Sequence, residues 1–366
     1  MRPWEKNIRQ VVPYVPGEQP AGDKIVKLNT NENPYPPAPG VKKVLEEMEA
    51  DRLRKYPDPT ASILVKELAS YYGLNDDQVF VGVGSDDVLA MSFLTFFNSD
   101  KPVLFPDVTY SFYKVWADLF KVPFETPVLK EDFTIDVKDY EKENGGVIFP
   151  NPNAPTGVYM PLDQVEEILK ANQDVVVIVD EAYVDFAGPS ALELLDKYEN
   201  LLVVQTFSKS RSMAGMRIGF AMGHPDLIRA LNDVKYSYNS YTMNLPSLLA
   251  GVEAVKDKEY FEKTIEKIVA TREHAKKRLT ELGFTFPNSQ SNFIFASHKS
   301  VPAEKIFEAL KKEQIYVRYF KTPGLDNSLR ISIGTDEEMD TLFRFWKHIY
   351  PMPERKMSEW INISCV

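Results

Sequence analysis

Residues 175–183 read VVVIVDEAY, a run of five branched apolar side chains that ends in an acidic pair. Apolar residues on both faces of a short strand are typical of parallel α/β sheets, in which helices cover both sides. In open sheets of that kind, ligands bind at the carboxyl ends of the strands. The stretch therefore predicts a buried strand at Val175–Val179 and a carboxylate, Asp180, in a crevice. Taken alone, Asp180 could equally cap a helix or shape a turn.

Similar apolar runs lie before and after this stretch, and amphipathic stretches separate several of them. The other predicted strands are Val79–Val83, Val103–Phe105, Val147–Phe149, Leu201–Gln205 and Gly219–Met222, and the predicted helices are Ile63–Tyr72, Val88–Phe97, Ser111–Phe120 and Leu162–Ala171. This alternation indicates an α/β fold with a mostly parallel central sheet flanked by helices.

The pattern changes after about residue 245. Apolar residues at helical spacing predict one long helix from Phe261 to Leu282, with Gly283 as its stop signal. Two strand-like runs and two helical patterns follow it and indicate a smaller α+β unit: Phe293–Ala296, Leu329–Ile333, Ala303–Lys312 and Glu337–Ile349. The proline-rich first thirty residues are interpreted as an arm that packs on another surface. We therefore expect a large domain at residues 31–248, and an arm with a small domain at residues 1–30 and 249–366.

Composition narrows the class of protein. The chain has 366 residues and a net charge of −10, which argues against nucleic acid as its main partner. No apolar run is long enough to span a membrane, and the first ten residues lack the apolar core of a signal peptide. The single cysteine, Cys365, fits a reducing compartment, so a cytoplasmic location is expected. The four histidines have no metal-ligand spacing, so no metal site is predicted.

A lysine follows the predicted strand Leu201–Gln205 in the sequence Thr206-Phe207-Ser208-Lys209, and Arg217 comes eight residues later. A lysine at the end of a strand is usually no more than solvent-exposed. Here hydroxyl groups and a guanidinium group lie nearby and form an anion site. A lysine beside such a site favours a Schiff base with a phosphorylated aldehyde.

The separation between Asp180 and Lys209 is 29 residues, the length of one strand–crossover–strand unit. That spacing can bring both residues to the same edge of the sheet. A carboxylate is also the partner that a pyridoxal ring requires at its nitrogen.

Residues 82–87 read GVGSDD and join a predicted strand to a predicted helix. Glycines at such a turn let backbone N–H groups approach a phosphate. With Asp107 about twenty residues on, the run also resembles a dinucleotide fingerprint, although Asp87 stands where a third glycine is required. A simple helix N-cap by Ser85 or Asp86 is the alternative that involves no ligand.

Together these motifs resemble the fold-type I pyridoxal-phosphate aminotransferases, and within them most closely the histidinol-phosphate aminotransferases. The resemblance extends from Tyr14 to Arg330. The motifs that carry it are NENPY at 31–35, KYPD at 55–58, GSD at 84–86, the segment 106–110, PTG at 155–157, DEAY at 180–183, Ser208-Lys209 with Arg217, and LRIS at 329–332.

The resemblance implies pyridoxal 5′-phosphate as cofactor and ping-pong transamination of L-histidinol phosphate with 2-oxoglutarate in histidine biosynthesis. Lys209 would form the Schiff base and move the substrate proton, Asp180 would pair with the ring nitrogen, and Tyr183 would bond the ring 3-oxygen. Tyr110 would stack on the ring. The resemblance implies further cofactor contacts for Ser85, Asp86, Thr206, Ser208, Arg217 and Tyr56, the last across the interface of a homodimer with shared active sites.

One position departs from the family pattern. The asparagine that usually precedes Pro-Thr-Gly is replaced by Ala154, and an asparagine lies one place earlier, at Asn153. Either Asn153 reaches the ring 3-oxygen, or Tyr183 bonds that oxygen alone.

The resemblance also implies a set of substrate contacts. Arg330 would hold the substrate α-carboxylate and Arg318 the substrate phosphate, and the other pocket residues would be Tyr14, Asn33 and Tyr35. Without the resemblance, Arg318 reads as a surface arginine. An aromatic aminotransferase, a threonine-phosphate decarboxylase and, from another class, an NAD-dependent dehydrogenase are the alternative functions.

Overall fold

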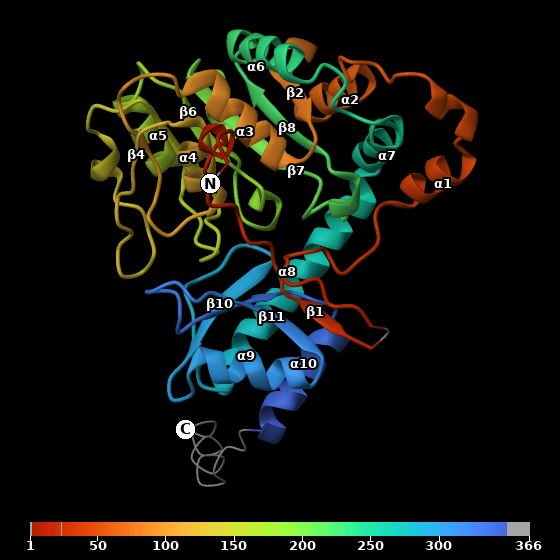
Figure 1. The fold of residues 1–366 in the computed structure, drawn as a ribbon. Coiled ribbons are helices and arrows are strands. Elements are labelled where there is room, and N and C mark those ends of the chain that lie inside the picture. The colour runs from red at the N-terminus through yellow and green to blue at the C-terminus, as the bar shows by residue number, and fades with distance from the viewer. Residues whose placement is uncertain (1, 23, 350–366) are drawn as a thin grey trace.

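The computed structural model describes residues 2–22 and 24–349 and contains two β-sheets in that part (Figure 1). The larger sheet has the order β2-β8-β7-β6-β5-β3-β4. Its strands are β2 (Val79–Gly82), β3 (Val103–Leu104), β4 (Phe124–Glu125), β5 (Gly146–Pro150), β6 (Val177–Asp180), β7 (Leu201–Thr206) and β8 (Gly219–Gly223). Only β8 runs against its neighbours β2 and β7, so the prediction of a mostly parallel sheet is confirmed.

Both faces of this sheet are buried, as the run at 175–179 predicts. Val177 and Val179 of β6 pack into one apolar cluster, and Ile178 between them packs into the other. Helices α2 (Ser62–Tyr72), α5 (Leu162–Ala171) and α7 (Leu245–Lys256) cover the first face, and α3 (Ser85–Phe96), α4 (Phe112–Phe120) and α6 (Pro225–Tyr238) cover the second. Helix α1 (Pro39–Glu47) packs against α7.

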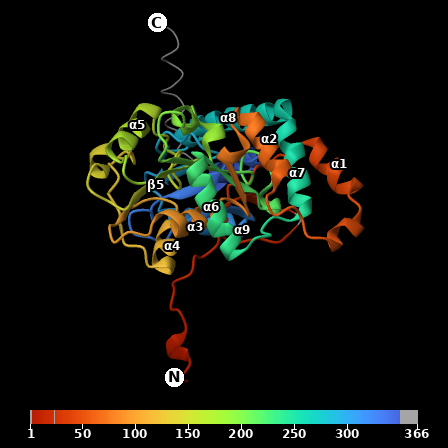
Figure 2. The same ribbon diagram turned by 90° about the horizontal axis from the view of Figure 1, so that it is seen from above.

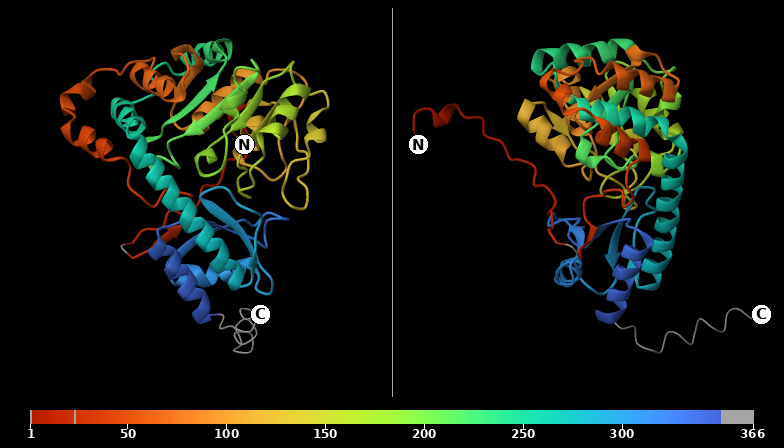
Figure 3. Two further views of the ribbon diagram at one scale, coloured as in Figure 1. Left: turned by 180° about the vertical axis from the view of Figure 1, so that it is seen from behind. Right: turned by 90° about the vertical axis from the view of Figure 1, so that its right-hand side faces the viewer.

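The smaller sheet has the order β1-β11-β12-β10-β9 and lies at the other end of the molecule (Figure 1). Its strands are β1 (Val26–Leu28), β9 (Phe284–Thr285), β10 (Phe293–His298), β11 (Ile315–Tyr319) and β12 (Leu329–Ser332). It packs on α8 (Lys258–Glu281), α9 (Ala303–Lys312) and α10 (Asp336–Ile349). The long helix α8 runs from one body of the molecule to the other, as the left view of Figure 3 shows.

The first part of the chain divides into two segments. Residues 26–28 form β1, which pairs in parallel with β11, so they complete the small sheet. The preceding arm leaves the body of the molecule (Figures 2 and 3) and exposes large apolar side chains at Trp4, Ile8, Val11, Val12 and Val15. Tyr14 ties the arm down, because its ring stacks on Phe112 with 4.2 Å between the ring centroids.

The predicted boundary between the two domains lies within a helix. The predicted boundary between residues 248 and 249 falls inside α7, which packs against α1 and α2.

Cys365 and the rest of the chain after residue 349 lie outside the described residues. Among the described residues, no helix combines the length and hydropathy that a membrane crossing requires.

Candidate active site

A cavity of about 220 Å³ lies where β5, β6 and β7 end. Pro150, Asp180 and Thr206, the last residues of these three strands, all line it. The loop after β7 supplies Ser208, Lys209 and Arg217, and the start of α3 supplies Ser85 and Asp86. The wall is completed by Thr30, Glu32, Tyr110, Ala154, Ala182, Tyr183 and Ala214. The structure thus gathers into one cavity most of the residues that the sequence predicts for cofactor binding.

Asp180 is buried at the base of this cavity. The hydroxyl of Tyr113 donates to its Oδ2 at 2.7 Å, and the backbone N–H of Ala182 donates to its Oδ1 at 3.2 Å. Burial raises the pKa of Asp180 to about 6, although both hydrogen bonds act to lower it. A cationic ring nitrogen would favour the ionised form. Tyr113 was missed in the sequence, where only its position three residues after Tyr110 could have indicated it.

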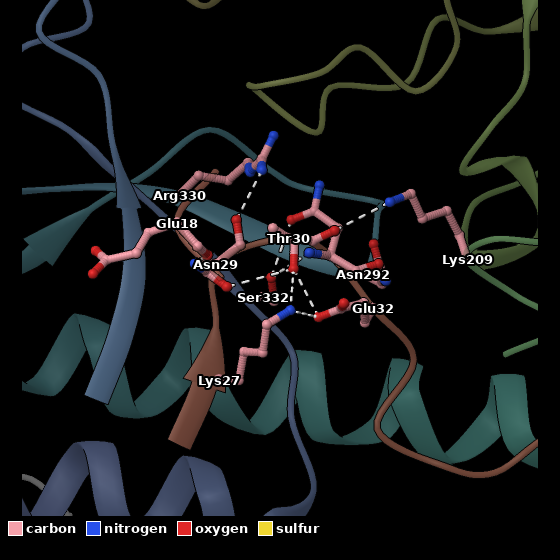
Figure 4. A network of polar contacts seen from close by, with 10 residues as sticks. Glu18, Lys27, Asn29, Thr30, Glu32, Lys209, Asn292, Arg330 and Ser332 are labelled. Carbon is pink, nitrogen blue, oxygen red and sulfur yellow. Dashed lines mark hydrogen bonds and ion pairs between the residues drawn. The ribbon is translucent and has the colours of Figure 1, made fainter. Parts of the chain in front are cut away.

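Lys209 reaches toward the segment that follows β1. Its Nζ donates to the backbone oxygen of Thr30 at 3.1 Å (Figure 4) and lies 5.9 Å from the centre of the Tyr183 ring. The loop that carries it is fixed by Thr206, whose Oγ1 accepts from the Ser208 N–H at 3.1 Å and donates to Ser208 Oγ at 3.0 Å. The lysine amine is therefore held in the cavity by a neutral acceptor that a ligand can replace.

The anion site predicted at the strand–helix turn is built around two glycines. A Cβ on Gly84 would lie 2.5 Å from Arg217 Nη2, and one on Gly219 would lie 2.2 Å from the carbonyl carbon of Gly84. Neither position admits a side chain. Arg217 Nη1 contacts Ser208 Oγ at 3.4 Å, so a guanidinium and a hydroxyl group meet beside the turn.

The N-cap by Ser85 or Asp86, which was the alternative without a ligand, is not found in the structure. Helix α3 begins at Ser85, and its N-cap is Gly84, which has no side chain to bond the first N–H groups. The helix N-terminus is therefore left free to receive an anion. The side chain of Asp86 instead accepts two hydrogen bonds. The Tyr110 hydroxyl donates to Asp86 Oδ1 at 2.7 Å, and Arg217 Nη2 donates to Asp86 Oδ2 at 3.2 Å. Burial, and then the charge of Asp86, raise the pKa of Tyr110.

The segment before Thr156 contains Ala154, which replaces the usual asparagine, and Asn153, which could act in its place. Ala154 lines the cavity, whereas the Asn153 amide donates to the backbone oxygen of Val108 at 3.1 Å and to Thr156 Oγ1 at 2.9 Å. Asn153 Oδ1 is buried without a hydrogen-bond partner in the described structure. The Asn153 amide nitrogen is thus engaged away from the cavity.

Two arginines from the small sheet lie side by side. Arg318 on β11 and Arg330 on β12 are directly opposite in the antiparallel register. Arg330 is half-buried and donates from Nη2 to the backbone oxygen of Asn29 at 3.1 Å (Figure 4), while its buried Nε has no partner among the described residues. Burial is the first cause that lowers the pKa of Arg330, and the charge of Arg318 adds to it. Such a pair favours a bound anion.

Asn153, Arg318 and Arg330 do not line this cavity, and four further predicted residues also lie outside its wall. Asn33 donates to the backbone oxygen of Ser210, next to Lys209, and Tyr14 stacks on Phe112. Tyr35 lines a separate cavity of about 430 Å³ together with Tyr260 and Lys267. Tyr56 is 82% exposed and stacks on Tyr241, with 4.6 Å between the ring centroids.

A third cavity, of about 560 Å³, lies between the loop 131–134 and the small sheet. Among its described lining residues there is none that the sequence assigns to a site. The chemistry is therefore concentrated in the smaller cavity at Lys209. That cavity joins a carboxylate, an amine and an anion site, a combination that suits a flat heteroaromatic phosphate with a protonated ring nitrogen.

Comparison with known proteins gives three consistent results. The family model for aminotransferase class I and II matches residues 23–345. The histidinol-phosphate aminotransferases of Brachyspira hyodysenteriae and Clostridium acetobutylicum are 52% and 53% identical to this chain, over 93% and 92% of its length and 97% and 96% of theirs. The structure of histidinol-phosphate aminotransferase from Sinorhizobium meliloti in complex with pyridoxal-5′-phosphate matches the fold, with a TM-score of 0.80, 24% identity and coverage of 88% of this chain and 91% of that chain.

Proposed function

Because the chain belongs to the class I and II aminotransferases, we propose that it transfers the amino group of L-histidinol phosphate to 2-oxoglutarate, with pyridoxal 5′-phosphate as cofactor. The observation that carries this proposal is the cavity that brings Lys209, Asp180 and Arg217 together. The relatives that match almost the whole chain at about half identity are histidinol-phosphate aminotransferases, which supports the substrate and a role in histidine biosynthesis.

The cavity fits this cofactor. Gly219 lets the backbone of Gly84 and Ser85 pass close by, and Gly84 lets Arg217 lie against the same turn. Arg217, Ser208 and the open N-terminus of α3 can therefore hold a phosphate group together. Asp180 supplies the carboxylate for the ring nitrogen, and Tyr110 supplies an aromatic face in the wall. When bound, pyridoxal 5′-phosphate supplies a carbonyl group that joins the substrate amine and a ring that accepts the electron pair of a breaking Cα–H bond.

Lys209 is the group that moves the proton. Its amine must leave the backbone oxygen of Thr30, a single neutral hydrogen bond that contributes on the order of 1 kcal/mol. As a base, Lys209 takes the proton from the substrate Cα, and as an acid it returns a proton in the second half of the reaction. Asp180 stays ionised while the ring nitrogen carries its proton, because the pair compensates the burial that raises the Asp180 pKa.

Tyr183 then bonds the ring 3-oxygen by itself. Ala154 offers no polar group to the cavity, and the Asn153 amide nitrogen is engaged by Val108 and Thr156. Of the two explanations that the sequence leaves open, this arrangement supports Tyr183.

The facing arginines on β11 and β12 support a phosphorylated substrate. Histidinol phosphate carries no carboxylate, so we propose that Arg318 and Arg330 receive its phosphate in the first half-reaction. In the second half-reaction Arg330 receives the α-carboxylate of the 2-oxo acid. An aromatic amino acid would bring only one negative charge to two guanidinium groups. Tyr14, Asn33 and Tyr35 remain proposed residues of the substrate pocket.

We also propose a homodimer with shared active sites. The exposed stack of Tyr56 on Tyr241, with Tyr238 74% exposed three residues earlier, offers an aromatic surface to a second copy of the chain. The arm at residues 2–22 exposes further apolar side chains. The division into a large domain at 31–248 and a small domain with the arm at 1–30 and 249–366, and a cytoplasmic location, remain part of this proposal.

Two measurements test the function. Lys209→Ala should abolish both turnover and the yellow absorbance that requires a Schiff base between Lys209 and the cofactor, and full activity in this variant would contradict the mechanism. A substrate panel on the purified protein separates the alternatives: we expect preference for histidinol phosphate over phenylalanine and no release of carbon dioxide. A strong preference for phenylalanine, or carbon dioxide release, would favour an aromatic aminotransferase or a decarboxylase.

A further inference from the structure

The segment that follows β1 receives a side chain on each of three successive backbone oxygens. Arg330 donates to the oxygen of Asn29 at 3.1 Å, Lys209 to that of Thr30 at 3.1 Å, and Asn292 to that of Asn31 at 3.0 Å. Figure 4 shows Arg330, Lys209 and Asn292 converging on this segment from three directions. The segment therefore contacts both the proton-carrying lysine and the anion-binding arginine.

Asn31 lies at the end of this triplet and is 1% exposed. Its backbone has a φ of 57°, in the left-handed region that asparagine tolerates better than most residues. Its amide nitrogen donates to Tyr183 Oη at 2.9 Å. A buried amide in an unusual backbone conformation thus touches the hydroxyl group that we propose bonds the ring 3-oxygen.

Ser332 fixes the orientation of the Asn31 amide. The backbone N–H of Asn31 can only donate, and Ser332 Oγ accepts from it at 2.9 Å. The hydroxyl proton of Ser332 is then free for the Asn31 side-chain oxygen, 3.1 Å away. The amide NH₂ must therefore point to Tyr183, which makes the tyrosine oxygen an acceptor in this contact.

The hydroxyl proton of Tyr183 is free to point into the cavity. Among the described residues no protein acceptor for it is found, and Tyr183 lines the cavity. The titratable groups near Tyr183 are Lys209, Arg330, Tyr110 and Tyr113.

We propose that Asn31 is a positioning residue: by donating to Tyr183 Oη, it commits the hydroxyl proton of Tyr183 to the ring 3-oxygen of the bound cofactor. This inference rests on the proposed function. Ser332 lies two residues after Arg330 on β12, so the same strand that binds the substrate anion also orients the amide that sets Tyr183.

Two substitutions at one position test the inference. Asn31→Asp is nearly isosteric but replaces the donor with an acceptor, which draws the Tyr183 proton away from the ring oxygen. Asn31→Gly removes the amide and keeps the left-handed backbone, which glycine adopts without strain, so it remains informative if the aspartate variant folds poorly.

The readout is the pH midpoint at which the visible absorbance of the bound cofactor changes, measured without substrate. A hydrogen-bond donor to the ring oxygen stabilises its negative charge and lowers this pH midpoint. Loss of that donor therefore raises the midpoint. We expect Asn31→Asp to raise the midpoint by roughly one unit, as a charge-assisted hydrogen bond predicts, and Asn31→Gly to raise it by less.

The double variant with Tyr183→Phe decides whether Asn31 acts through Tyr183. If it does, Asn31→Asp adds little to the midpoint once Tyr183→Phe is present. Additive shifts in the double variant, or an unchanged midpoint in both single variants at position 31, would overturn the inference. Failure of the proposed function is recognised separately, because the unmodified protein would then show no visible absorbance that depends on Lys209.

Discussion

Arg318 and Arg330 face each other across β11 and β12, with their Cα atoms in register and the two guanidinium carbons 5.5 Å and 5.6 Å from the same ring, Phe320. Like charges repel, so an anion bound between these two guanidinium groups would lower their mutual repulsion. Both side chains are half-buried, and the buried Nε of Arg330 lacks a partner in the described structure.

The first prediction concerns this pair. Arg318→Ala should raise the KM for histidinol phosphate by about 10- to 100-fold, the cost of losing a charge-assisted hydrogen bond, and should raise the KM for 2-oxoglutarate less. Arg330→Ala should impair both half-reactions. Steady-state kinetics with each substrate varied in turn provide the measurement. Equal losses for both substrates in Arg318→Ala would show that Arg318 does not select the phosphate.

The second prediction concerns the hydrogen bond from Tyr113 to Asp180. Tyr113→Phe removes a bond to the charged carboxylate, so the pKa of Asp180 should rise further and pyridoxal 5′-phosphate should bind about 10-fold more weakly. Fluorescence titration of the cofactor-free protein measures this affinity. Tyr140→Phe is the matched control, because the buried Tyr140 hydroxyl has no partner in the described structure and lies outside the cavity.

The third prediction concerns Glu181, which is buried beside Asp180 and is not used by the mechanism. Its carboxylate accepts from Ser190 Oγ and the Ala191 N–H, each at 2.6 Å, and from Gln205 Nε2 at 3.0 Å. Burial nevertheless raises its pKa from 4.5 to about 7. Because the folded pKa lies above the unfolded one, Glu181 contributes most stability below about pH 4.5 and loses it as the pH rises through about 7.

Glu181→Gln makes this effect measurable, since glutamine does not titrate. Between about pH 5.5 and about pH 8, the free energy of unfolding of the cofactor-free protein should fall by about 2 kcal/mol more in the unmodified chain than in Glu181→Gln. Asp180 is present in both proteins, so its contribution cancels. A difference between the two proteins that stays constant with pH would rule out a raised pKa at Glu181.

The fourth prediction concerns the proposed dimer. Tyr56→Ala and Lys209→Ala should each abolish most activity alone, the first by removing a contact to the cofactor phosphate in the other protomer. Mixed dimers contain one site with both residues intact, so reassociation of equal amounts should restore about one quarter of the activity. No recovery, in a mixture that mass spectrometry shows to contain mixed dimers, would place Tyr56 in the same protomer's site or outside both.

The large sheet was predictable because its signal is local. Val177, Ile178 and Val179 are apolar in succession since each packs into one of the two clusters, and that pattern is visible in five residues. Strand β6 itself begins two residues later than predicted and includes Asp180. Helix α1 was not predicted. Pro39 occupies its first turn, where no N–H is needed.

The parts that the sequence does not reveal depend on long-range contacts. Strand β1 is three residues long and is defined by its pairing with β11. The contact of Tyr113 with Asp180 joins residues 67 positions apart, and that of Asn31 with Ser332 joins residues 301 positions apart. Motifs identify Lys209, Asp180 and Arg217, but the residues that orient them are found only when the chain is folded.

The pairing of β1 with β11 has a consequence for synthesis of the protein. Because residues leave the ribosome in sequence order, Val26 emerges about 290 residues before its partner Ile315. The last strand of the large sheet ends at residue 223, so this sheet can form before β11, the partner of β1, has been translated. The segment at residues 29–31 can reach Arg330 only after Arg330 has been translated, so a nascent chain acquires Lys209 and Arg217 well before Arg330, the arginine that we propose binds substrate.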